Sequence, residues 1–264
     1  MHIFIKTVLS GALLTTSTLT QADLIDFEGF AVGTIIDSEY QASHGVTING
    51  VNVDRGVDGM ATIFDTLSPT GGDTDLAGPF SNPSLGSANP GNVLIIHEHP
   101  NECNGILCND PDDEGSRPAG YFEIVFGNAV TLNSIDFFDI EGAENGTSPN
   151  NLIQLFDEFS TEISPTTFYT PGTGGDNTWG RLNFTAAGVS SIHLRLGGSG
   201  AIDNIRYERV TDQPGGGEAP APATPALLLL GALALSQVRR ARAIARAHKG
   251  RWAKATALAL PYAR

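Results

Sequence analysis

Short apolar runs recur along most of the chain and are separated by turn signals rich in Gly, Asn, Asp, Ser and Pro. In several runs apolar and polar residues alternate, and Ile192, Leu194 and Leu196 form one such series. A period of two places one face of a strand against a core and the other face in water. No long stretch in the body of the chain shows helical periodicity. The pattern predicts strands at Leu24–Phe27, Val46–Val53, Thr62–Phe64, Val93–Ile96, Tyr121–Phe126, Val130–Ile140, Leu152–Phe156, Trp179–Phe184, Ser191–Leu196 and Ala201–Tyr207.

About ten short strands predict an all-β fold, and we expect an antiparallel β-sandwich of the jelly-roll type. Two long polar segments, Leu67–Asn92 and Glu98–Gly120, interrupt the strand pattern. Long loops without regular structure are unusual in a compact domain, and they tend to be functional or held by a cross-link or ligand. The second segment contains Cys103 and Cys108, which predict one disulfide in an oxidising compartment. A metal site at this pair would need further soft ligands.

The two ends of the chain carry processing signals. A charged start at Lys6, an apolar run from Val8 to Leu19 and a small-residue site ending at Ala22 predict a cleaved signal peptide. Export from the cytoplasm follows from that signal. The predicted organisation is a signal peptide at 1–22, a β-sandwich domain at 23–210, a Gly/Pro/Ala-rich linker at 211–225, an apolar helix with an Arg cluster at 226–240, and a basic tail at 241–264.

The apolar segment after the linker is short for a membrane span. The run from Ala226 to Val238 would form a helix about 20 Å long, whereas a bilayer-spanning helix takes roughly 20 residues. Arg239 and Arg240 follow directly and are expected to stay on the cytoplasmic side. The segment therefore predicts retention or sorting at a membrane, and both a permanent and a transient attachment fit it.

Charge is divided sharply along the chain, whose formal net charge is −14. All 29 acidic residues lie between Asp23 and Glu218, where six arginines and no lysine accompany them, a net charge of −23. From Arg239 to Arg264 there are eight basic residues and no acid. So acidic a domain repels nucleic acid, which argues against DNA or RNA as a partner. The acidity suits either bound divalent cations or simple solubility.

The C-terminal region has a three-part pattern: Pro225 and Ala226, then a Leu/Ala/Gly run, then Arg239 and Arg240. This pattern resembles the PEP-CTERM sorting segment of Gram-negative bacteria, with Ala-Thr at 223–224 in place of the usual Pro-Glu. The resemblance implies a protein of the cell surface, outer envelope or extracellular matrix of a Gram-negative bacterium. It also implies an exosortase-type sorting enzyme and the membrane as partners.

A second resemblance rests on four short stretches in the body of the chain, Asp26–Gly29, Gly72–Leu76, Asn92–Ile96 and Ala201–Ile205. These stretches resemble parts of the β-sandwich domains that often precede such sorting segments. Those domains are described as galactose-binding-like or concanavalin-like. Most of those domains have no assigned activity. The resemblance implies a carbohydrate or exopolysaccharide ligand and a structural calcium that ties the first strand to the last.

Calcium is therefore the expected cofactor, because hard cations take several oxygen ligands, often carboxylates and loop carbonyls together. The resemblance points to Glu28 and Asp203 as ligands, with Asp26 as an alternative. Asp73 and Asp75, on a Gly-rich loop, could form a second site. The other interpretation of these aspartates is turn formation, since an Asp side chain bonds its own backbone.

Chemical motifs are few. The sequence has no nucleophile elbow, phosphate loop or His-Glu-x-x-His. Asp136, Asp139 and Glu141, near a predicted strand end, could form a glycosidase pair. The stretch 110–115 resembles the start of an EF-hand loop, but Tyr121 stands at its twelfth position instead of Glu. Aromatic residues on an exposed sheet face would suit stacking on sugars, with core packing as the other interpretation; the candidates are Tyr40, Tyr121, Tyr169, Trp179 and Tyr207.

We therefore expect a non-enzymatic surface or matrix protein whose calcium-stabilised sandwich binds carbohydrate. One alternative is a secreted hydrolase that acts on polysaccharide. Another is a purely structural, adhesive protein with no small ligand.

Overall fold

The computed structural model describes residues 21–142, 144, 146–163 and 166–209. Most of the predicted signal peptide lies outside the described residues, as do the linker, the apolar segment and the basic tail. The roles expected for Pro225, Ala226, Arg239 and Arg240 therefore stay predictions. None of the helices in the described ranges is long and apolar enough to cross a membrane.

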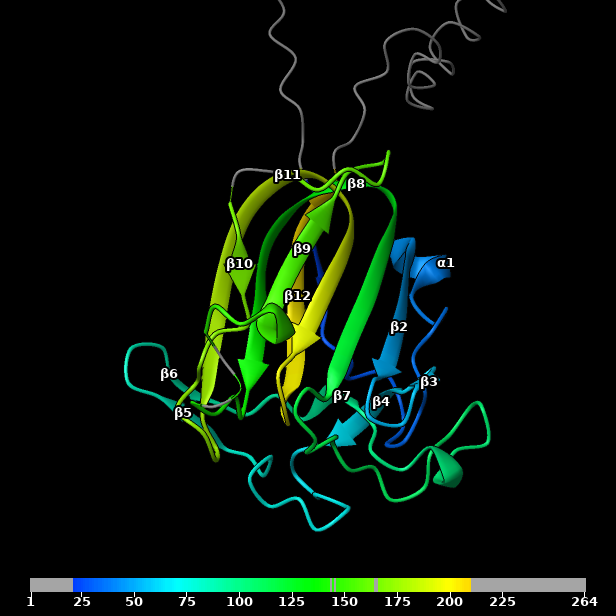
Figure 1. Ribbon diagram of the computed structural model, residues 1–264, viewed down its shortest axis with the longest axis vertical. Helices are drawn as coiled ribbons and strands as arrows, with labels where there is room; N and C mark the ends of the chain where they lie inside the picture. Colours follow the sequence, from blue (N-terminus) through cyan, green and yellow to red (C-terminus); the bar gives the residue numbers. More distant parts are fainter. Residues whose placement is uncertain (1–20, 143, 145, 164–165, 210–264) are drawn as a thin grey trace, which may run out of the picture. The chain divides into compact units, whose positions relative to one another are not determined.

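The described residues form strands almost throughout (Figure 1). The only α-helix among them is the single turn α1, and two 3-10 turns lie at Pro100–Glu102 and Pro149–Asn151. In chain order the elements are β1 (Gln21–Ile25), α1 (Gln41–His44), β2 (Val46–Asn52), β3 (Val57–Asp58), β4 (Ala61–Asp65), β5 (Phe80–Asn82), β6 (Gly86–Ala88), β7 (Asn92–Ile96), β8 (Gly120–Phe138), β9 (Leu152–Phe156), β10 (Phe168–Tyr169), β11 (Trp179–Leu196) and β12 (Ala201–Arg209).

Two long strands, β8 and β11, pair with each other along their whole length and belong to both layers of a sandwich. The first half of β8 pairs with β2 and the second half with β12. The second half of β11 pairs with β9, and β12 pairs with β1 and β7. Every pairing between these strands is antiparallel, which confirms the predicted all-β antiparallel sandwich. The finer jelly-roll assignment stays a prediction.

The strand prediction was wrong where these long strands bend. Tyr121–Phe126 and Val130–Ile140 were expected as two strands, and Trp179–Phe184 and Ser191–Leu196 as two more, but each pair is one continuous strand. Three register shifts separate Asn183 from Ser191 in the pairing of β11 with β8. Because bulges bend a strand without ending it, a polar or glycine-rich break in the pattern marks a curve here and not a turn. Figure 1 shows both strands arching over one end of the domain.

Two apolar clusters stabilise the fold. The larger one fills the space between the layers and includes Ile48, Leu94, Phe122, Phe137 and Ile205, all fully or nearly fully buried. The apolar positions of the alternating runs point into this cluster. Burial of each large apolar side chain contributes roughly 1.5–3 kcal/mol to folding.

The smaller cluster lies on the outer face of β7 and the strand ends beside it. In β7, Val93 and Ile95 belong to this cluster, whereas Leu94 belongs to the larger one. A strand buried on both faces needs a cover, and the long segment Leu67–Asn92 supplies it with Leu76 and Phe80. The segment is therefore not a structureless loop: it contains the hairpin of β5 and β6.

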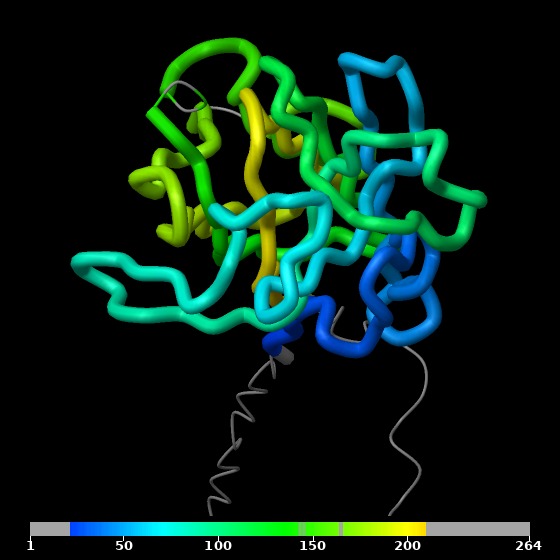
Figure 2. Tube along the Cα trace, turned by 90° about the horizontal axis from the view of Figure 1, so that it is seen from below, coloured from blue at the N-terminus to red at the C-terminus, as the bar shows by residue number. Residues whose placement is uncertain are grey.

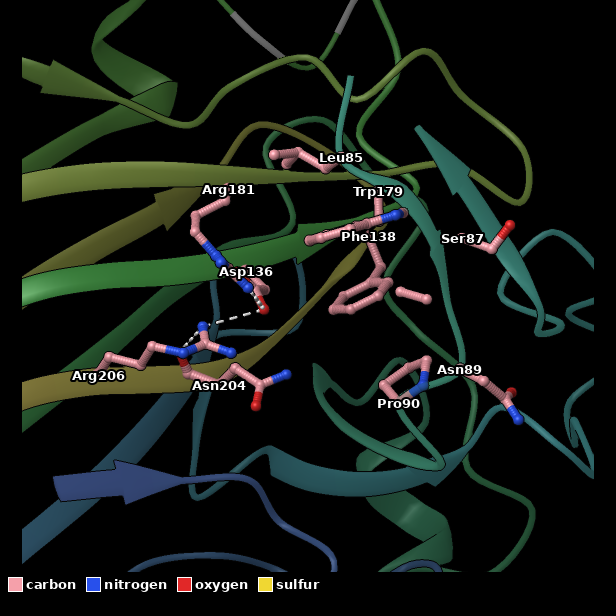
Figure 3. A pocket seen from close by; sticks show the side chains of 11 residues that line it. Leu85, Ser87, Asn89, Pro90, Asp136, Phe138, Trp179, Arg181, Asn204 and Arg206 are labelled. Atoms are coloured by element: carbon pink, nitrogen blue, oxygen red, sulfur yellow. Dashed lines mark hydrogen bonds and ion pairs between the residues drawn. The ribbon is translucent and has the colours of Figure 1, made fainter. Parts of the chain in front are cut away.

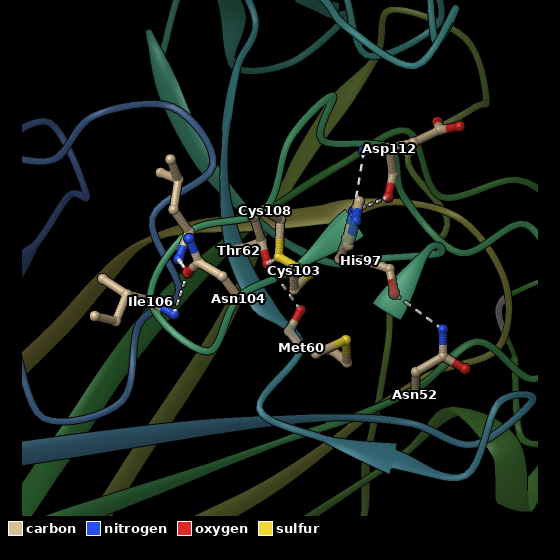
Figure 4. Close-up of a disulfide and its surroundings, with 10 residues drawn as sticks. Asn52, Met60, Thr62, His97, Cys103, Asn104, Ile106, Cys108 and Asp112 are labelled. Carbon is tan, nitrogen blue, oxygen red and sulfur yellow. Dashed lines mark hydrogen bonds between the residues drawn. A yellow bond between two sulfur atoms is a disulfide. The ribbon is translucent and has the colours of Figure 1, made fainter. Parts of the chain in front are cut away.

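The second long segment, between β7 and β8, contains the predicted disulfide between Cys103 and Cys108. The Cys108 Sγ lies 3.6 Å from the Thr62 hydroxyl on β4 (Figure 4). Figure 2 shows the two long segments, in cyan and blue-green, on the end of the sandwich that faces the viewer. Each was predicted as a polar loop, and together they build the face on which the acidic side chains gather.

Candidate functional site

Five aspartates meet where the two long segments reach the strand ends, and we call them the aspartate cluster: Asp73, Asp75, Asp112, Asp113 and Asp139. One carboxylate oxygen from each of Asp73, Asp112 and Asp113 lies within 4.8 Å of the other two. Asp73 and Asp75 share a side-chain hydrogen bond. Asp139, directly after β8, is close enough to Asp75 and Asp113 for their charges to act on it. The cluster combines three parts of the chain that are far apart in sequence.

Backbone bonds fix the aspartates of the second segment. His97 and Asp113 form an isolated bridge, and the Glu98 amide donates to the Asp112 carbonyl at 2.9 Å. The Gly200 amide, just before β12, donates to Oδ2 of Asp113. The carboxylate of Asp113 is thus held against the start of the last strand.

The first segment is locked against the second by its own contacts. Thr70 donates its hydroxyl to the Pro111 carbonyl at 2.7 Å, and the Gly71 amide donates to Oδ1 of Asp110 at 2.9 Å. Gly71 has φ +67°, and a Cβ there would lie 2.4 Å from the side chain of Asp112. Only glycine allows this approach.

A single asparagine holds the loop of Asp73 and Asp75 in shape. The Asn177 side-chain amide donates to the carbonyls of Thr74, Asp75 and Ala77, at 3.2, 2.9 and 2.7 Å. Its backbone amide also donates to the Asp75 carbonyl, at 2.9 Å. Asn177 belongs to the connection between β10 and β11. Its hydrogen bonds therefore hold the loop of Asp73 and Asp75 against the sheet next to Asp139.

The electrostatics of the cluster disfavour five free carboxylates. Burial raises the pKa of Asp73 to about 9, with its hydrogen bond to Asp75 and the charge of Asp113 adding to the effect. Burial also raises the pKa of Asp113 to about 7 and that of Asp139 to about 8. For Asp112, burial and the charge of Glu98 raise the pKa to about 6. The shared bond has the opposite effect on Asp75 and lowers its pKa.

Two buried oxygens of the cluster have no hydrogen-bond partner, Oδ2 of Asp73 and Oδ1 of Asp139. Asp139 is 2% exposed, so bulk solvent hardly reaches it. Among the described residues, no ion pair reaches any of the five carboxylates. Buried polar groups are normally paired, so each of these two oxygens needs a partner.

The predicted first-to-last-strand ligands lie round a different pocket. Asp26 and Glu28 follow β1, Asp203 lies on β12, and all three line a cavity of about 480 Å³. Oδ2 of Asp203 accepts from Asn204 at 2.7 Å, but Oδ1 is buried without a partner. Burial raises the pKa of Asp203 to about 9, and the charges of Asp136, Glu28 and Asp26 add to it. These three are not among the described groups of three or more ligands whose donor atoms lie within 4.8 Å of one another.

Next to this cavity lies a pocket of about 370 Å³ that we call the arginine pocket (Figure 3). At its centre Asp136 on β8 accepts two bonds from Arg181, from Nε at 2.6 Å and from Nη2 at 3.0 Å. Arg206 donates to the same carboxylate at 3.1 Å. Asn89 and Asn204 line both this pocket and the cavity of Asp203.

Strand register explains why these charged side chains meet. Arg181 on β11 lies directly opposite Asp136 on β8, so both project from the same face. On β12, Asp203 pairs with Asp136, but Arg206 pairs with Ser134, so β12 contains one extra residue. This bulge, with Asn204 at φ 53°, turns Arg206 onto the face that carries Asp136.

The remaining candidates have other roles. Asp136 is held between two guanidinium groups and does not stand free as a catalytic acid. Tyr40 and Tyr207 are buried in the larger core, so the stacking interpretation was wrong for them. Trp179 lines the arginine pocket, although it is only 6% exposed and its indole donates to the Gly86 carbonyl at 2.9 Å. Its ring lies 5.7 Å from the Arg181 guanidinium.

The sequence did not predict that the residues of the aspartate cluster, or those of the arginine pocket, come together. It grouped Asp73 with Asp75 but assigned residues 110–115 to a separate EF-hand-like loop and Asp139 to a glycosidase pair. It did not single out Arg181 or Arg206. The charge count contained a usable signal. The domain and its linker have six arginines for 29 acidic residues, so few cations are available to pair with any one carboxylate.

No family model matches the chain, and no curated protein matches it in sequence. Among solved structures, it is similar to a mutant of the lectin binding domain of lectinolysin complexed with Lewis b. The identity is 13%, the match covers 37% of this chain and 68% of that one, and the TM-score is 0.24. A likeness of this extent carries no argument about the fold or the ligand of this chain.

Proposed function

We propose that the protein is an exported, non-enzymatic protein of the cell surface or extracellular matrix that binds carbohydrate in the arginine pocket. The observation that carries the proposal is the pair of arginines held on one buried carboxylate at the wall of an open pocket. Export rests on the signal-peptide pattern, and retention rests on the C-terminal resemblance to sorting segments. Calcium, with Asp26, Glu28, Asp203, Asp73 and Asp75 as ligands, is the cofactor of this proposal.

The unused donors of the arginines support a polar ligand. Bonds to Asp136 account for two of the five N–H groups of Arg181. Arg206 uses one nitrogen for Asp136 and for the Asn204 carbonyl, at 3.1 Å each. Because guanidinium donors have a fixed fork geometry, the remaining groups are ready to bind sugar hydroxyls or carboxylates. The amides of Asn89 and Asn204 add donors and acceptors at the rim.

Charge favours an acidic saccharide over a neutral one. The pocket contains two guanidiniums and one carboxylate, a local charge of +1 in a domain that is otherwise strongly acidic. A uronate-bearing polymer would be repelled by most of the surface and attracted to this position, which gives orientation as well as affinity. The partner proposed is therefore an exopolysaccharide that carries carboxylate groups.

A glycan array with the full chain tests the proposal, and uronate-bearing and neutral oligosaccharides are compared on it. We expect binding to acidic glycans, a loss of at least tenfold in Arg181→Gln, and no change in Arg55→Gln, whose side chain is exposed and pairs only with acids outside the pocket. An array without any signal would leave the structural, adhesive alternative. Release of reducing sugar that disappears in Asp136→Asn and Glu141→Gln would instead establish the hydrolase alternative and refute the non-enzymatic one.

A further inference from the structure

We infer that the aspartate cluster is a calcium site that fastens both long segments to the end of β8. The inference is independent of glycan binding and assigns ligands that the sequence did not bring together. Asp73 and Asp75 come from the first segment, Asp112 and Asp113 from the second, and Asp139 from the end of β8. An ion among them would connect three parts of the chain at one point.

The donor set fits calcium by chemistry and by size. All five side chains offer carboxylate oxygens and none offers nitrogen or sulfur, which favours a hard cation over zinc or copper. Calcium–oxygen distances are about 2.3–2.6 Å, so ligands on opposite sides of the ion lie roughly 4.6–5.2 Å apart. The donor atoms of Asp73, Asp112 and Asp113 lie within 4.8 Å of one another, so they are close enough to bind one ion together.

The second argument is the unpaired oxygen of Asp139. This residue is 2% exposed, it lies among other carboxylates, and its Oδ1 has no hydrogen-bond donor. Asp113, 9% exposed, has only the Gly200 amide for its Oδ2. A buried charge is costly unless it is paired or coordinates a metal. Within the described residues no arginine or histidine pairs with either, so a cation is the partner that the site lacks.

The alternative compensation is protonation, and it shows how a cation would act. Burial and mutual repulsion raise the pKa values of Asp73, Asp113 and Asp139 to about 9, 7 and 8. Without an ion the folded domain must therefore keep protons on these carboxyls near neutral pH. A divalent cation would replace those protons, since metal ligands bind in their deprotonated form.

An ion at this site would also support the hairpin of β5 and β6. The first segment covers the outer apolar cluster through Leu76 and Phe80. Direct contacts between the two long segments include the bonds Thr70–Pro111 and Gly71–Asp110. Coordination through Asp73 and Asp75 would add a strong link immediately before Leu76. Calcium should therefore stabilise the fold and not merely bind to its surface.

Calcium binding to the full chain tests the inference, with isothermal titration for stoichiometry and affinity and thermal unfolding for stability. Calcium alone is the probe, and magnesium is the comparison, because it demands a smaller octahedral site. We expect one ion per chain to be lost, or its affinity to fall at least tenfold, in Asp139→Asn and in Asp75→Asn. Asp75 is partly exposed, so its variant keeps the test valid if Asp139→Asn does not fold.

Asp203→Asn removes a ligand of the other proposed calcium site and is the matched comparison, because Asp203 is equally buried and has an unpaired oxygen and a raised pKa. The inference requires an ion that Asp203→Asn retains and that both cluster variants lose. Any other pattern of calcium binding among the three variants overturns the inference. One such pattern is calcium binding that only Asp203→Asn abolishes. That last result would preserve a calcium-stabilised sandwich and move its ion to the cavity of Asp26 and Glu28.

Discussion

Asp139 should make the calcium-free protein less stable as the pH rises, and Asp139→Asn should remove this dependence. An aspartate with an ordinary pKa of 3.8 has lost its proton at pH 5, whereas in the folded state the pKa of Asp139 is raised to about 8. Between pH 5 and pH 7 the folded chain thus holds one proton more than the unfolded chain at this residue. Stability must then fall as the pH rises through this range.

The size of the effect follows from the same numbers. One proton per pH unit corresponds to about 1.4 kcal/mol, so Asp139 alone lowers the free energy of unfolding by at most about 3 kcal/mol from pH 5 to pH 7. Because the residue is 2% exposed, solvent screening reduces this little. The groups that raise its pKa besides burial are all acidic, Asp75, Asp113, Asp176 and Glu144, and each acts in the same direction.

Other groups titrate in the same range, so the difference between wild type and variant is the informative quantity. Burial lowers the pKa values of His97 and His193, and these residues make stability rise with pH as their unfolded forms lose a proton. Urea unfolding of both proteins, dialysed free of divalent cations and followed by far-ultraviolet circular dichroism at pH 5, 6 and 7, separates the contributions. The variant should gain on the wild type with each pH unit. A constant difference, or a wild type that gains on the variant, would refute the reasoning.

Three further predictions concern the same end of the domain. Calcium binding at pH 7 should release about two protons per ion, which titration calorimetry in buffers of different ionisation enthalpy measures; no release would contradict the raised pKa values. Gly71→Ala should weaken calcium binding at least tenfold, because its Cβ would collide with Asp112, whereas Gly29→Ala meets nothing within 4 Å and serves as the control in the same titration. Phe80→Ala should lower the free energy of unfolding, measured in urea, by about 3–5 kcal/mol. The reason is that the Phe80 ring is fully buried and its centroid lies 4.8 Å from that of Phe138. A loss below about 1 kcal/mol would mean that the hairpin is not part of the folded core.

The sequence was informative where one local pattern determines one element. The run Leu152–Phe156 was predicted with its exact bounds, and Val93–Ile96 with an error of one residue, because alternation or a continuous apolar run bounded by turns identifies a strand directly. The disulfide of Cys103 and Cys108 followed from a close pair of cysteines in a chain that is expected to be exported to an oxidising compartment. What alternation cannot tell is whether a break ends a strand or bends it, and this is why β8 and β11 were each divided in two.

The sites were less predictable because they depend on pairing between distant segments. Nothing local to Asp113 indicates that Gly200 donates to it or that Asp73 lies beside it. Similarly, Arg206 reaches Asp136 only because a bulge adds one residue to β12. A shift of one residue in register moves a side chain to the opposite face, so such contacts require the sheet topology and cannot be derived from composition.

The aspartate cluster and the arginine pocket share one segment, and their ligands should therefore influence each other. The segment Leu67–Asn92 supplies Asp73 and Asp75 near one end and the pocket residue Asn89 near the other, with Phe80 buried between them. If calcium orders this segment, a glycan meets a preformed pocket and loses less affinity to ordering it. Couplings of this kind are typically 1–3 kcal/mol, or about 5–150-fold.

Glycan affinity of the wild type should accordingly fall at least about fivefold when calcium is removed, and by thermodynamic linkage the glycan should raise calcium affinity by the same factor. In Asp139→Asn, the response of glycan affinity to calcium should be smaller than in the wild type. Titrations of glycan at saturating and at zero calcium, and of calcium with and without glycan, measure both sides of the cycle for the two proteins. Equal glycan affinity of the wild type with and without calcium would show that the hairpin holds its shape without the ion, because Phe80 and the outer cluster would then suffice to order the pocket.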